Sequence, residues 1–173
     1  FVVENNWSYE ENPANISYDL SVSINGKKVL SQDNLTHYHH ARWRRLFWVD
    51  TPPQFNLRHD YGYLIKTGAL PVYDPHVITP ASVTDDLARQ WSKDGYELMG
   101  IGLIGSYMPQ TGARPELGPL PSWAAIYLMT MDKHAKEVVL GQGDQAGSWS
   151  IHYRDRRTGL PISIDDYPYM TLL

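Results

Sequence analysis

Residues 16–24 read Ile16-Ser17-Tyr18-Asp19-Leu20-Ser21-Val22-Ser23-Ile24, and Asn25-Gly26 follows directly. Every second residue is apolar or aromatic and the residues between are polar, which is the pattern of a half-buried strand. Asn-Gly then supplies both left-handed positions of a type I′ turn. Because Lys27-Lys28-Val29-Leu30 continues beyond the turn, the sequence predicts a β-hairpin here.

The residues that follow this hairpin also favour strands. Residues 35–49 are rich in β-forming side chains, and we interpret them as one or two strands that end at Pro52 and Pro53. Phe55, Leu57 and His59 alternate with polar residues, which predicts a further short strand that runs into residues 61–65.

The second half of the chain has a helical character. Residues 80–91 begin with a capping pattern and early acids, residues 121–129 are a short apolar segment, and Asp132 can cap a helix that runs to Leu140. Residues 149–154 and 160–164 flank a loop with Gly159 and predict a closing hairpin. We therefore expect an α+β fold, with an antiparallel β-sandwich-like part in residues 1–78 and a helical part with a C-terminal hairpin in residues 79–173.

The composition excludes several classes of protein. The 173 residues have a net charge of −4 and no cysteine, which argues against a general polyanion binder and excludes disulfides and cysteine-based metal sites. No apolar run has the roughly 20 residues that span a bilayer. Twelve tyrosines and six tryptophans against three phenylalanines favour either a turn-rich β core or an aromatic surface for a sugar, and both interpretations stay open.

The order of elements in residues 80–165 resembles a known architecture. Thr111-Gly112-Ala113-Arg114-Pro115-Glu116-Leu117-Gly118-Pro119-Leu120-Pro121-Ser122-Trp123 leads into two short helices and then into an aromatic hairpin. This order resembles one unit of an (α/α) toroid, as in glycoside hydrolases and polysaccharide lyases with an N-terminal β-sandwich, and also large bacterial and phage-associated proteins. The resemblance implies a carbohydrate-facing scaffold, although no catalytic motif of those families is matched.

Candidate site residues follow from the chemistry that a glycoside needs. General acid–base catalysis requires two carboxyl groups, or a histidine or tyrosine base with an arginine nearby. The catalytic candidates are Glu116, Asp155, His152 and Tyr107, and the substrate-binding candidates are Arg114, Trp123, Trp149 and Arg154. The competing interpretation is structural: Arg114 and Glu116 pair with the backbone of a rigid loop, and Arg154 and Asp155 begin a turn.

Two further clusters are open to a functional or a structural interpretation. His37 and His39 would share one face of a strand, near His40 and the His59-Asp60 pair, but a third metal ligand at a suitable spacing is missing. We therefore expect no metal and no cofactor. Basic and aromatic residues are also interleaved in one stretch, and together they could pair with phosphates and stack on bases. The acidic net charge argues against nucleic acid. The residues of this stretch are Arg42, Trp43, Arg44, Arg45, Phe47 and Trp48.

The resulting hypothesis is a carbohydrate-binding or carbohydrate-processing module that is extracellular, periplasmic or virion-associated, with a polysaccharide or glycan as its partner. Whether it is an enzyme stays open. The alternative is a non-catalytic structural or assembly subunit whose aromatic side chains form protein interfaces. The apolar end at residues 167–173 and the start at Phe1 lead us to expect a fragment of a longer protein, or a partner subunit that covers this end.

Overall fold

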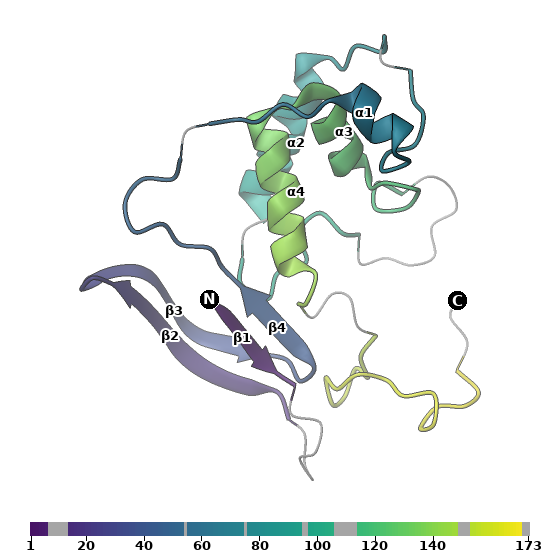
Figure 1. The fold of residues 1–173 in the computed structure, drawn as a ribbon. Helices are drawn as coiled ribbons and strands as arrows, with labels where there is room; N and C mark the ends of the chain where they lie inside the picture. The colour runs from purple at the N-terminus through teal and green to yellow at the C-terminus, as the bar shows by residue number, and fades with distance from the viewer. Residues whose placement is uncertain are drawn as a thin grey trace. The chain divides into compact units, whose positions relative to one another are not determined.

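The computed structural model describes residues 1–6, 14–53, 55–74, 76–94, 97–105, 114–148 and 153–170. Within these residues the chain forms four strands followed by four helices, so the predicted α+β fold is confirmed (Figure 1). Contacts divide it into a strand unit (Phe1–Pro52, Glu97–Ile101 and Asp144–Leu173) and a helix unit (Pro53–Tyr96 and Gly102–Gly143). These units interleave along the chain, whereas the sequence predicted a single boundary after residue 78.

The longest strands of the strand unit form the predicted hairpin. Strand β2 (Ile16–Ile24) pairs antiparallel with β3 (Lys27–His37), and Val22 lies opposite Leu30. Asn25 and Gly26 have φ values of 50° and 78°, as a type I′ turn requires. The alternating pattern and the turn therefore confirm the predicted hairpin.

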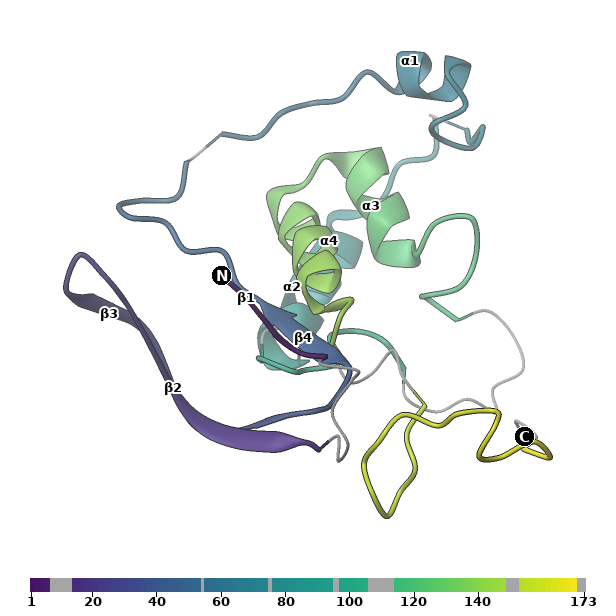
Figure 2. The ribbon, with the colours of Figure 1, turned by 60° about the horizontal axis from the view of Figure 1, so that its bottom comes forward.

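The β2–β3 hairpin bends along its length in both views (Figures 1 and 2). Its register shifts between Tyr18 and Leu20, and again between Val22 and Ser23. Near the first shift, Asn34 adopts a φ of 50° and its N–H donates to Oδ1 of Asp19 at 2.9 Å. Register irregularities of this kind bend a strand and increase its twist, which explains the curvature.

A second antiparallel sheet pairs β1 (Val2–Asn5) with β4 (Ala41–Arg44). Side chains from both sheets share one core, whose buried members are Leu35, Trp43 and Leu98. Half-buried apolar side chains of β1, β2, β3 and a loop pack against them, and they are Val3, Tyr18, Leu20, Leu30 and Met99. Two sheets of two strands each do not confirm the predicted β-sandwich.

The helix unit contains α1 (Tyr61–Lys66), α2 (Ala81–Asp94), α3 (Ser122–Thr130) and most of α4 (Lys133–Gln145). Helices α2, α3 and α4 lie where the sequence predicted helices. Their common core consists of Leu87, Trp91, Trp123, Ala135 and Val138. Because short helices are only marginally stable in water, the packing of these apolar side chains supplies most of their stability.

The predicted strand that runs into residues 61–65 is wrong, because these residues form helix α1. Oδ1 of Asp60 accepts the N–H of Tyr63 at 3.0 Å and caps the first turn of the helix. The N–H of Thr67 donates to the carbonyl oxygen of Tyr63, and Gly68 then takes a φ of 73°. A side-chain cap and a left-handed glycine delimit a helix, and here they override the alternation at Phe55, Leu57 and His59.

The C-terminal segment of the strand unit contains the predicted turn. Arg154 and Pro161 form an antiparallel bridge, and the N–H of Asp155 donates to the carbonyl oxygen of Leu160 at 2.9 Å. Gly159 closes the turn with a φ of 69°. Residues 149–152, which belong to the predicted first arm 149–154, lie outside the described residues.

In the part of the chain that the structure describes, no helix combines the length and the apolar character that crossing a bilayer requires.

Candidate functional site

Arg114 and Glu116 form an ion pair within the helix unit. Nη2 of Arg114 donates both to Oε1 of Glu116 and to the carbonyl oxygen of Gly105. Their side chains are only 8% and 14% exposed. Arg114 makes the predicted contact to the loop backbone, whereas Glu116 pairs with the side chain of Arg114. A largely buried ion pair of this kind holds the base of the loop together.

Asp155 accepts three hydrogen bonds in the C-terminal turn. Its Oδ1 accepts the N–H groups of Thr158 and Arg157, each at 2.9 Å, and its Oδ2 accepts the hydroxyl of Tyr167 at 3.0 Å. The bond from Thr158, followed by that from Arg157, lowers the pKa of Asp155 below its usual value. The carboxylate therefore stays ionised at neutral pH, which suits an acceptor of hydrogen bonds better than a general acid.

Arg154 lies beside Asp155 and contacts Tyr38. Its Nη1 donates to the carbonyl oxygen of Gly159 at 3.0 Å, and its Cζ lies 5.2 Å from the centroid of the Tyr38 ring. Burial lowers the pKa of the guanidinium, although it remains charged at any physiological pH. Arg154 thus fixes the turn to the ring of Tyr38.

The remaining candidates fall into two groups. Trp123 is 6% exposed and belongs to the core of the helix unit, so its ring faces other side chains. Tyr107, Trp149 and His152 lie outside the described residues. Of the candidate carboxylates, Glu116 belongs to the helix unit and Asp155 to the strand unit.

His37 ends a chain of hydrogen bonds inside the strand unit. The indole Nε1–H of Trp43 donates to the hydroxyl oxygen of Tyr18 at 2.8 Å, and this hydroxyl lies 2.9 Å from Nδ1 of His37. Nε2 of His37 lies 2.9 Å from the carbonyl oxygen of Ala41, which can only accept, so Nε2 carries the proton and Nδ1 accepts from Tyr18. Both ring nitrogens are thus used within the fold.

The described residues contain no group of three or more histidine, aspartate or glutamate side chains that could hold a metal ion. His37 and His39 are 0% and 3% exposed, respectively.

In the basic and aromatic stretch of residues 42–48, Trp43 is buried in the core and Trp48 is exposed.

Acid should destabilise the strand unit through His37. Burial lowers the pKa of this histidine in the folded protein, so the unfolded chain binds more protons at pH values near and below 6.5. The contribution of His37 to the free energy of unfolding is therefore fully present above this pH and is lost as the pH falls. The loss is at most about 1.4 kcal/mol per pH unit for one proton. Urea unfolding between pH 7.5 and pH 5 measures the slope.

The matched variant for this test is His37→Gln, because an amide cannot take up the proton. It should flatten the pH dependence of the unfolding free energy even though it also lowers stability at neutral pH. An unchanged slope in His37→Gln would show that other groups produce the acid sensitivity.

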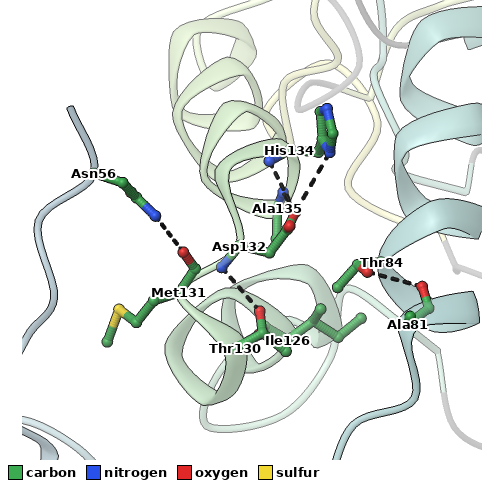
Figure 3. A network of polar contacts seen from close by, with 9 residues as sticks. All are labelled: Asn56, Ala81, Thr84, Ile126, Thr130, Met131, Asp132, His134 and Ala135. Carbon is green, nitrogen blue, oxygen red and sulfur yellow. Dashed lines mark hydrogen bonds and ion pairs between the residues drawn. The ribbon is translucent and has the colours of Figure 1, made fainter. Parts of the chain in front are cut away.

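Polar contacts at the junction of α3 and α4 form a cluster that the sequence did not predict (Figure 3). Met131 ends α3 with a φ of 52°, and its carbonyl oxygen accepts the side-chain amide of Asn56. Oδ1 of Asp132 accepts the N–H groups of His134 and Ala135 at 2.9 and 3.0 Å, which confirms Asp132 as the predicted cap of α4. The hydroxyl of Thr130 accepts the N–H of Asp132 at 3.1 Å.

This cluster forms one wall of an open cleft with a volume of about 490 Å³, which we call the junction cleft. Its lining residues come from segments far apart in the sequence, and they are Asn56, Arg58, Thr79, Ala81, Thr84, Thr130, Met131, Asp132 and Lys133. No spacing rule links these segments, so only the fold brings them together.

A second exposed feature is the series of tyrosines around the C-terminal turn. Tyr153, Tyr167 and Tyr169 are 49%, 38% and 95% exposed, and the hydroxyl of Tyr167 is the one that donates to Asp155. Exposed tyrosines combine an apolar ring with a polar group, which is a common property of binding surfaces.

Comparison with protein-family models, with curated proteins and with solved structures yields no match. The resemblance to a toroid unit therefore stays a prediction.

Proposed function

We propose that this chain is a carbohydrate-binding module whose sugar surface lies on residues 153–170. The observation that carries the proposal is the contact between Tyr167 and Asp155, in which a partly exposed aromatic ring adjoins an ionised carboxylate. The ring face can stack on the apolar face of a pyranose, and Oδ2 of Asp155 can accept a second hydrogen bond from a sugar hydroxyl.

The proposed role is binding rather than cleavage. A glycosidase needs a carboxylic acid that donates a proton, and the hydrogen bonds to Asp155 keep it ionised. Glu116 is engaged by Arg114. In keeping with a glycan partner, we place the protein outside the cell, in the periplasm or on a virion.

Binding should depend on the ring of Tyr167. We expect isothermal titration calorimetry against neutral and acidic polysaccharides to find a ligand that Tyr167→Ala weakens by about tenfold or more. Tyr167→Phe keeps the ring but loses the bond to Asp155, so it should lie between the wild type and Tyr167→Ala. Tyr63→Ala, at an exposed tyrosine of the helix unit, is the control and should bind as the wild type does.

A second candidate function, assembly with protein partners, is favoured by a different observation. Leu46, Trp48 and Val49 are 56%, 47% and 65% exposed within a few residues of one another. Phe47 packs edge-on against Phe1, with 5.6 Å between ring centroids. Clustered exposed apolar side chains typically mark protein interfaces. No response to any glycan, together with self-association in light scattering, would contradict sugar binding and favour assembly.

A further inference from the structure

We propose that the junction cleft of the helix unit binds the phosphate group of a small phosphomonoester. All lining residues of the cleft belong to the helix unit, whereas the tyrosines of the proposed sugar surface belong to the strand unit.

Three side chains of the cleft carry hydrogen-bond donors that could bind a ligand. The Arg58 guanidinium, the Lys133 ammonium and the Thr79 hydroxyl all line it, and the structure gives them no hydrogen-bond or ion-pair partner among the described residues. Arg58 and Lys133 are exposed and Thr79 is half-buried, so a ligand can reach all three. A guanidinium fork with an ammonium and a hydroxyl is a suitable donor set for phosphate.

Among the described residues that line the cleft, Asp132 is the one acidic residue, against the two basic residues Arg58 and Lys133, so the lining keeps a net positive charge. Oδ1 of Asp132 is already occupied by the N–H groups of His134 and Ala135 at the start of α4. Its negative charge therefore lies against a helix start that favours it. The backbone there is already capped, so Arg58, Lys133 and Thr79 would provide the contacts to an anion.

The other walls of the cleft are fixed by hydrogen bonds within the protein. The hydroxyls of Thr84 and Thr130 donate to the carbonyl oxygens of Ala81 and Ile126 at 2.8 and 2.7 Å (Figure 3). The side chain of Asn56 holds its segment against Met131. A site whose walls are already ordered loses little entropy when a ligand binds.

The size of the cleft indicates more than an inorganic ion. A volume of about 490 Å³ lies within the range of pockets for small organic molecules. Phosphate would occupy only part of it, which leaves space for an organic group beside the threonines and Met131. We therefore infer a phosphomonoester of small size rather than free phosphate.

The test uses the full 173-residue chain and three probes: ribose 5-phosphate, ribose and inorganic phosphate. Two-dimensional amide NMR should show saturable shifts with ribose 5-phosphate at Thr79, Met131 and Lys133. Inorganic phosphate should produce weaker shifts at the same amides, and ribose should produce none. Arg58→Gln and Lys133→Gln should each weaken binding of ribose 5-phosphate by about tenfold.

Lys93→Gln is the matched control, because it removes one positive charge from α2 at a place that does not line the cleft. It should bind ribose 5-phosphate as the wild type does, and the spectra of all variants show whether the fold is kept. Absence of saturable shifts, equal binding in all three variants, or shifts that ribose alone also produces would each overturn the proposal. Equal affinity for inorganic phosphate and ribose 5-phosphate would overturn the inference of a phosphomonoester.

Discussion

Replacing Trp43 with alanine should lower the free energy of unfolding of the strand unit by about 3–5 kcal/mol. Trp43 is 2% exposed and lies in the core that β3, β4 and Leu98 share. The substitution leaves a cavity and removes the N–H that donates to Tyr18. Urea unfolding followed by circular dichroism measures the loss without depending on tryptophan fluorescence.

Trp48→Ala is the control for this prediction, because it removes the same side chain from a site that is 47% exposed. Its unfolding free energy should stay within about 0.5 kcal/mol of the wild type, measured at a protein concentration low enough to avoid association. Equal losses in the two variants would contradict the core position of Trp43.

Gly141→Ala should destabilise the helix unit by about 1–3 kcal/mol, although alanine is normally the better helix former. A Cβ on Gly141 would lie 2.6 Å from Cη2 of Trp91 and still closer to its Cζ2. Because Trp91 is a buried core residue, its ring cannot move away without disturbing Leu87 and Val138. Thermal and urea unfolding of the variant measure the loss.

Gly143→Ala, in the same helix, should have the opposite effect on stability. A Cβ at Gly143 meets nothing within 4 Å, so alanine should stabilise α4 by about 0.5–1 kcal/mol. If both substitutions stabilise the protein, α2 and α4 do not approach each other as closely as the structure places them.

Local rules predicted those parts of the fold that depend on neighbouring residues. Asn25-Gly26 specified its turn, and Asp132 specified the start of α4, because each acts on backbone groups within three residues of itself. Helix α1 was missed although its signals were present in Asp60 and Gly68. The alternation before it was the more regular pattern, and periodicity alone does not decide a helix of six residues.

Long-range features were beyond these rules. The excess of tryptophan could not distinguish core residues from surface residues: Trp43, Trp91 and Trp123 are buried, and Trp48 is exposed. The junction cleft combines three segments separated by some twenty to fifty residues, and no motif links them. The ion pair of Arg114 with Glu116 was within reach of sequence reasoning, because both residues lie in one short loop.

The interleaving of the two units limits how the chain can be dissected. Residues 53–143 contain the whole helix unit, but any such fragment also carries Glu97–Ile101 away from the strand unit. With it goes Leu98, which packs with Leu35 and Trp43. Limited proteolysis or a shortened gene could therefore yield the helix unit as a single polypeptide. The strand unit consists of three separate segments, so it could be reconstituted only by fragment complementation from several peptides.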